Sequence, residues 1–165
     1  MENLFINKAK TSGIIAIDLL DYKPLTEIAT FDIKDLLFLG MIVKEKPFRE
    51  SVSALDFTEY KEKTVAVTCS ADAIIPSWAY MLLAEKLHPH AAHIDFSGPE
   101  TMRLDLWKQN LQNADWKQYK DQKVVVKARS EITPALYLLA SFLLKPWVKS
   151  LMYGEIGMPK VIYKK

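Results

Sequence analysis

The chain has 165 residues, of which half are apolar and a quarter are charged, a composition that fits one folded domain and argues against a disordered protein. Its 22 basic and 20 acidic side chains leave a formal charge of +2, too small to indicate nucleic acid or anionic lipid as the main partner. The longest apolar run, residues 135–144, is too short to span a membrane, and the single cysteine, Cys69, excludes an internal disulfide, so we expect a cytoplasmic protein.

Residues 1–35 are expected to form an N-terminal β extension. Residues 14–17 and 27–33 are rich in apolar and β-branched side chains, and a turn-like Tyr-Lys-Pro segment separates them, so both are predicted to be strands. A further short strand is predicted at residues 36–39, directly before Gly40. The pattern does not indicate where these strands lie in a sheet.

The rest of the chain contains two tandem repeats, at residues 36–97 and 98–165. Residues 48–67 align without a gap onto residues 107–126, and the match resumes after a loop that is two residues shorter in the second copy. The matched pairs include Phe48 with Trp107, Asp56 with Asp115, Tyr60 with Tyr119, Val65 with Val124, Tyr80 with Tyr137 and Phe96 with Tyr153. We therefore expect both copies to fold with the same order of elements.

Each repeat is predicted to contain a helix, a strand, a helix and a strand. Apolar residues three and four apart predict the first helix, and short β-branched runs predict the strands. The later elements are strands at residues 64–68 and 123–127, helices at 76–88 and 134–145, and strands at 94–96 and 151–153. Because helical crossovers join parallel strands, we predict an α/β fold with two βαβα-like repeats in one mostly parallel sheet covered by helices, as a single domain over residues 1–165.

Polar side chains follow the two matched central strands, at the edge where open parallel sheets bind ligands. The candidates are Cys69, Ser70 and Asp72 after the first of these strands, and Arg129, Ser130 and Glu131 after the second. The two loops are equivalent in the repeat, but one carries a thiol and the other a guanidinium. We expect all six residues at one edge, between the two repeats.

Each candidate has a chemical interpretation and a structural one. A thiol just before a helix can act as a nucleophile, a redox group or a soft metal ligand, but cysteine is also often a small buried side chain. Asp72 can serve as a general base or cap the next helix. Arg129 can clamp an anion with two hydrogen bonds, or pair with Glu131 or Asp72.

Three histidines, His88, His90 and His93, are close together in the sequence. They flank a predicted helix end, where a cation is favourable, and their spacing alone is a weak metal signal. They precede a strand whereas Cys69 follows one, so in a parallel sheet His93 and Cys69 should lie at opposite edges. We expect no metal site and no cofactor.

Three segments resemble a family of short bacterial cytosolic proteins classified only as a domain of unknown function. They are residues 69–80 (CSADAIIPSWAY), residues 32–35 (DIKD) and residues 149–155 (KSLMYGE). The resemblance covers nearly the whole chain. It implies a single-domain bacterial protein and brings no activity, ligand or catalytic residue with it.

Two hypotheses of function follow. The first is a non-enzymatic binding module that holds a small anionic or polar ligand, or a partner protein, with Ser70, Arg129, Ser130 and Glu131. The second is a small enzyme that uses Cys69 as nucleophile or redox thiol, with Asp72 or Glu131 as acid and base. No nucleic acid or membrane partner is expected.

The helix predicted near residues 135–144 has no charge on any face. A helix that is apolar all round must be covered all round, either by the N-terminal extension or by a second molecule. The second case gives a homodimer through this helix, with Leu143 as an outward-facing contact.

Overall fold

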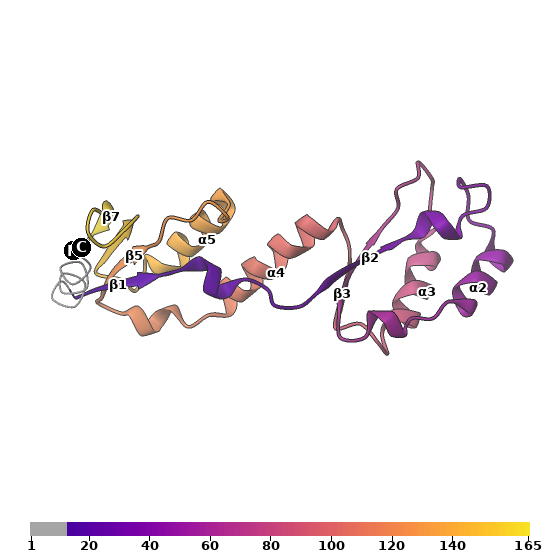
Figure 1. Cartoon of the computed structure of the whole chain (residues 1–165), viewed down its shortest axis with the longest axis horizontal. Coiled ribbons are helices and arrows are strands. Elements are labelled where there is room, and N and C mark those ends of the chain that lie inside the picture. The colour runs from indigo at the N-terminus through magenta and orange to yellow at the C-terminus, as the bar shows by residue number, and fades with distance from the viewer. Residues whose placement is uncertain (1–12) are drawn as a thin grey trace, which may run out of the picture. The chain divides into compact units, whose positions relative to one another are not determined.

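A computed structural model describes residues 13–165 of the chain (Figure 1). Residues 1–12 of the expected N-terminal extension lie outside the described part. The chain divides into a central unit, Leu25–Asp105, and a terminal unit formed by Leu106–Lys165 and the N-terminal segment that ends at Pro24. In the described part of the chain, no helix is long and apolar enough to cross a membrane.

The central unit contains a three-stranded parallel sheet in the order β2-β3-β4. Its strands are β2 (Ile28–Asp32), β3 (Thr64–Thr68) and β4 (His93–Phe96), its helices are α2 (Glu45–Ala54) and α3 (Ser77–Leu87), and its 3-10 helices are η2 (Ile33–Leu36) and η3 (Thr58–Tyr60). β3 lies in the middle and is buried over most of its length, as its β-branched sequence predicts.

Both helices of the central unit bury one face in the same core. Phe48 and Val52 are four residues apart on α2, and Leu83 and Leu87 are four apart on α3, so each pair lies on a single helical face. All four side chains are at most 1 % exposed and share a cluster with Val65 of β3. The spacing of Phe48 and Val52 therefore identifies the buried face of α2, but Leu55, the next apolar residue at this spacing, follows the end of the helix and is 42 % exposed.

The terminal unit contains a four-stranded sheet in the order β1-β5-β6-β7. Its strands are β1 (Ile14–Ile17), β5 (Lys123–Val126), β6 (Ser150–Tyr153) and β7 (Lys160–Lys164), its helix α5 is Pro134–Leu144, and its 3-10 helices are η1 (Leu19–Tyr22) and η4 (Trp116–Tyr119). The first three strands are parallel and β7 is antiparallel to β6. The remaining helix, α4 (Pro99–Asn113), contains the point in the chain where the central unit ends.

The two units have the same order of elements, and hydrogen bonds recur at matched positions. The backbone N–H of Glu62 donates to the carbonyl of His90, and the N–H of Asp121 donates to the carbonyl of Trp147, each at 2.9 Å. Glu62 and Asp121 are also both in the left-handed region, with φ of 61° and 59°. The turn before each central strand is therefore built in the same way.

The N-terminal extension supplies the first strand of both sheets. β2 pairs with β3 and β1 pairs with β5, so the whole central unit is inserted in the chain between the first strand of the terminal unit and the rest of it. The strands predicted at residues 14–17 and 27–33 are thereby confirmed.

The α/β class and the mostly parallel pairing are confirmed, but the expectation of one shared sheet is wrong. β3 pairs with β2 and β5 pairs with β1, so two sheets form.

The strand predicted at residues 36–39 is also wrong. Asp32 accepts a hydrogen bond from the Lys34 N–H at 3.0 Å and caps a 3-10 helix there, and Leu39 has φ of 54°, which no strand allows. The single-domain organisation stays a prediction.

We predict that α5 is stabilised through one face only. Leu136 is fully buried and Leu138 is 76 % exposed, so Leu136→Ala should lower the free energy of unfolding by about 2–5 kcal/mol and Leu138→Ala by less than about 1 kcal/mol. Denaturant unfolding of both variants measures the difference. Equal losses would contradict the assignment of the buried face.

Candidate functional site

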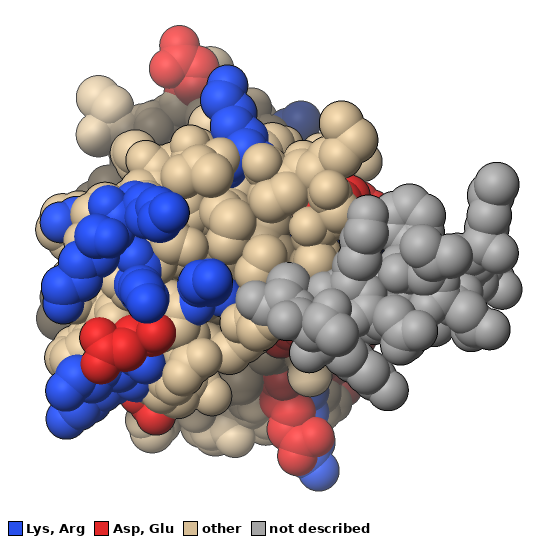
Figure 2. Space-filling model, turned by 90° about the vertical axis from the view of Figure 1, so that its left-hand side faces the viewer, with Lys and Arg blue, Asp and Glu red and all other residues tan. Residues whose placement is uncertain are grey.

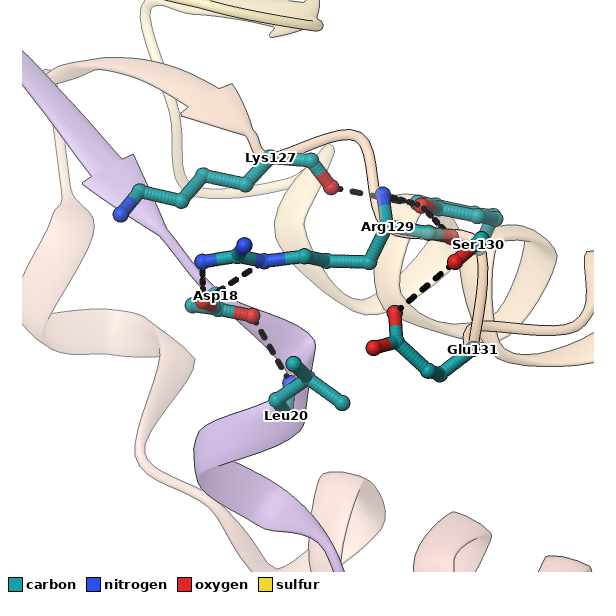
Figure 3. A network of polar contacts seen from close by, with 7 residues as sticks. Asp18, Leu20, Lys127, Arg129, Ser130 and Glu131 are labelled. Atoms are coloured by element: carbon teal, nitrogen blue, oxygen red, sulfur yellow. Dashed lines mark hydrogen bonds and ion pairs between the residues drawn. The ribbon is translucent and has the colours of Figure 1, made fainter.

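An ion pair joins two strands at the carboxyl-end edge of the terminal sheet. Asp18 directly follows β1, and Arg129 lies in the loop after β5, the strand that pairs with β1. Nε and Nη2 of Arg129 donate to Oδ2 of Asp18 at 3.1 and 2.6 Å, while Oδ1 of Asp18 accepts from the N–H of Leu20 at 3.0 Å and caps η1 (Figure 3). Both oxygens of the carboxylate are therefore engaged.

The environment of this pair keeps both groups charged. The hydrogen bond from Arg129 lowers the pKa of Asp18 against the opposing effect of burial, and Asp18 in turn raises the pKa of Arg129. The Asp18 side chain is 14 % exposed and that of Arg129 40 %. For Arg129, the sequence left open an anion clamp or a pair with Glu131 or Asp72. The observed partner is Asp18, because strand pairing places Asp18 next to the loop while Glu131 accepts a hydrogen bond from Ser130 at 3.3 Å.

Tyr137 of α5 holds the same loop from the other side. Its hydroxyl oxygen accepts from the N–H of Arg129 at 2.9 Å, and the hydroxyl is within donating distance of the Lys127 and Arg129 carbonyls, at 3.3 and 3.2 Å. Burial raises the pKa of Tyr137, so the hydroxyl keeps its proton at neutral pH. The loop that carries Arg129 is thus fixed by Asp18 and Tyr137, and sequence analysis missed both in this role.

A sequence signal for Asp18 was present. An apolar strand followed by an Asp-x-x-Asp segment occurs twice, at residues 18–21 and 32–35, and in both places the first aspartate caps a 3-10 helix through its own side chain. The repeated segment marks the two N-terminal strands as corresponding elements, although it does not show which strand each of them pairs with.

Asp32 makes the matching contact in the central unit. Its carboxylate accepts from Oγ of Ser70 at 2.6 Å, from the Ser70 N–H at 3.1 Å and from the Lys34 N–H at 3.0 Å, and these hydrogen bonds lower its pKa. Ser70, like Arg129, lies in the loop that follows the strand paired with the first strand of its sheet. At both edges, the loop after the central strand is therefore tied to the aspartate that ends the first strand.

Cys69 is half-buried beside this network. Its Sγ donates to the carbonyl of Ala71 at 3.5 Å, and no disulfide involves it. The expected separation from His93 is confirmed, because His93 pairs with Thr64 at the opposite end of β3.

Asp72 is exposed and does not cap α3, which begins at Ser77 after Pro76 with no side-chain cap. In the described part of the chain, no three His, Cys, Asp or Glu side chains are grouped to hold a metal ion.

An apolar groove lies beside Tyr137 in the terminal unit. It has a volume of about 550 Å³ and is lined by residues of β5, β6, α5 and β7. The lining residues are Val126, Pro134, Tyr137, Leu138, Ser141, Leu151, Met152, Tyr153 and Ile162. No charged side chain is among them, and the hydroxyls of Tyr137, Tyr153 and Ser141 are its polar groups. The groove suits an apolar ligand better than an anion.

The fold and these edges define an α/β protein of two parallel-sheet units, each with a carboxylate-bound loop at its carboxyl-end edge. The chain belongs to the family described as protein of unknown function (DUF2480), which matches residues 3–165. No curated protein and no solved structure matches it. Membership of a family of unknown function is thereby confirmed, while the family motif and the bacterial origin stay predictions.

We predict that the Asp18 carboxylate stabilises the fold in its ionised form. Because its folded pKa lies below the ordinary 3.8, Asp18→Asn should lower the thermal midpoint at neutral pH. The difference from the unchanged protein should shrink as the pH falls through 3.8 and the folded pKa. Asp21→Asn, on the exposed side of the same turn, is the control and should change little. A pH-independent difference would refute the ionic contribution.

Proposed function

We propose that this chain is a non-enzymatic binding module whose ligand site is the apolar groove of the terminal unit. The observation that carries the proposal is the groove itself. Its volume of about 550 Å³ falls within the roughly 300–1,000 Å³ of small-molecule sites, and it combines an apolar lining with a few hydroxyls that can orient a ligand. The ligand class is an apolar molecule with one hydrogen-bonding end.

The position of the groove fits the general rule for parallel sheets. Val126 and Tyr153 are the last residues of two neighbouring parallel strands, and Pro134 begins the helix that connects them, so the groove opens at the carboxyl-end edge. The tyrosine rings of Tyr137 and Tyr153 meet edge to face, with centroids 5.5 Å apart. This contact gives the polar end of the groove a defined shape.

The polar ligand site first expected at Ser70, Arg129, Ser130 and Glu131 has less support. Arg129 already donates two hydrogen bonds to Asp18, and Ser70 donates two to Asp32. Asp18 neutralises the charge of Arg129 and takes two of its five N–H donors, and Asp32 engages both donors of Ser70, so these residues attract an anion less strongly than unpaired ones. We therefore place the ligand in the groove and assign the polar residues a structural role.

Filling the groove tests the proposal. The half-buried Ser141 lines it, and Ser141→Trp should weaken the binding of the neutral dye Nile red by about tenfold, measured by fluorescence titration. Ala84→Trp is the matched control, since Ala84 occupies the equivalent half-buried position of α3 in the central unit. Equal affinity in both variants would exclude the groove as the site.

A homodimer is the second candidate, favoured by the outer face of α5. Leu138 and Phe142 are four residues apart and 76 % and 79 % exposed, whereas Leu143, first expected to point outward, is half-buried. The residue of α3 aligned with Phe142 is Glu85, so Phe142→Glu gives α5 the polarity of α3. Sedimentation at micromolar concentration should show a dimer that Phe142→Glu dissociates, while Met81→Glu on the exposed face of α3 leaves it intact. A monomeric mass for the unchanged chain would refute the dimer.

The enzyme hypothesis rests on Cys69 and has no further support. The contact of the thiol is with a backbone carbonyl, and Asp72 is exposed beside it in the sequence. Rapid alkylation of Cys69 at neutral pH would revive this hypothesis. The bacterial origin and cytoplasmic location implied by the resemblance stay predictions, and the shared order of elements supports an internal duplication.

A further inference from the structure

The small net charge of the chain is the sum of opposite net charges in its two units. Leu106–Lys165 carries eleven Lys and Arg residues against four Asp and Glu, whereas Leu25–Asp105 carries eight against thirteen. The terminal unit is therefore basic and the central unit acidic. The small total charge of the chain therefore does not exclude an anionic partner for the terminal unit.

The positive charge gathers at the amino-end edge of the terminal sheet. A pocket of about 270 Å³ lies there, away from the carboxyl ends of the strands, and includes three lysines, Lys120, Lys145 and Lys165. Lys120 precedes β5, Lys145 follows α5 and Lys165 follows β7, so three separate elements bring them together. A space-filling view toward this side shows Lys and Arg concentrated on one part of the surface (Figure 2).

The backbone around the pocket is held by hydrogen bonds. The N–H of Asp121 donates to the carbonyl of Trp147, and the N–H of Lys165 donates to the carbonyl of Lys149, each at 2.9 Å. Nζ of Lys145 lies 4.7 Å from the centre of the Tyr163 ring. Tyr163 and Trp147 line the pocket and are half-buried, so aromatic surface forms part of its wall.

The lysines are not neutralised by neighbouring carboxylates. Within residues 13–165, none of the three ammonium groups takes part in an ion pair, and Asp121 is the single acidic side chain in the lining. The lining side chains thus carry three positive charges and one negative charge. This excess of positive side chains favours an anionic ligand.

The equivalent turn of the central unit has different side chains. The repeat aligns Lys120 with Lys61, Lys145 with His88 and Trp147 with His90, although the turn is built with the same backbone hydrogen bond. The backbone alone therefore does not require three lysines. Their concentration is specific to the terminal unit.

We propose that this pocket binds the dianion of a phosphate monoester. The phosphate would contact Lys120, Lys145 and Lys165, and the group attached to it would lie against Trp147 and Tyr163. The site lies at the opposite edge from the apolar groove and takes a different ligand. A failure of one proposal therefore does not affect the other. The same chemistry occurs in a free phosphate ester and in the headgroup of phosphatidic acid.

Phenyl phosphate is the probe, and isothermal titration calorimetry is the measurement. We expect saturable binding at pH 7.5 that weakens by about tenfold or more in the double variant Lys120→Gln/Lys145→Gln. The control is Lys61→Gln/Lys86→Gln, which removes the same charge from the central unit and should keep the affinity. Circular dichroism melting checks that both double variants remain folded.

Two further experiments test the charge of the ligand and whether it is a free ester or a lipid headgroup. Methyl phenyl phosphate, a monoanion, should bind about tenfold more weakly than phenyl phosphate, and phenyl phosphate itself should lose affinity as the pH falls below about 6, where the monoester becomes a monoanion. Flotation with phosphatidic acid vesicles shows whether a lipid headgroup is accepted as well as the free ester. Absence of saturable binding to both probe and vesicles, or equal weakening by the central-unit control, would overturn the proposal.

Discussion

The parallel pairing of β1 with β5 is the interaction on which the terminal unit depends. Residues 14–17 meet residues 123–126 although the whole central unit lies between them in the chain. The pairing gives β5 a neighbour on the side away from β6, so the central strand is hydrogen-bonded on both sides. It also brings Asp18 to the loop that carries Arg129, which fixes the carboxyl-end edge.

The two edges of the terminal sheet use charge in opposite ways. At the carboxyl-end edge, Arg129 is satisfied by Asp18, so its charge stabilises the fold and leaves an apolar groove as the accessible feature. At the amino-end edge, three lysines and one acidic residue, Asp121, line a pocket, and none of these lysines forms an ion pair within residues 13–165. A charge that is neutralised by a partner attracts a ligand less strongly than an unpaired one.

The two units have different side chains at corresponding places of a similar backbone. Ser70 and Arg129 both bind the aspartate that ends the first strand, yet only Arg129 brings a charge. His90 and Trp147 both accept the same backbone hydrogen bond, from Glu62 and Asp121. Backbone hydrogen bonds constrain the turn and not the side chain, so side chains of different chemistry fit at these positions. The terminal unit also adds β7, which lines the groove and the basic pocket.

Local pattern in the sequence determined the helices and central strands, because apolar spacing and β-branched runs depend on neighbouring residues alone. The helix predicted at residues 134–145 is Pro134–Leu144, and the strand predicted at 64–68 is Thr64–Thr68. Only the tertiary structure decided which strands pair, since parallel partners far apart in the chain leave no local signal. This strand pairing produces two sheets and makes Asp18 the partner of Arg129. It also divides the chain into a basic and an acidic unit, which the total charge of +2 does not reveal.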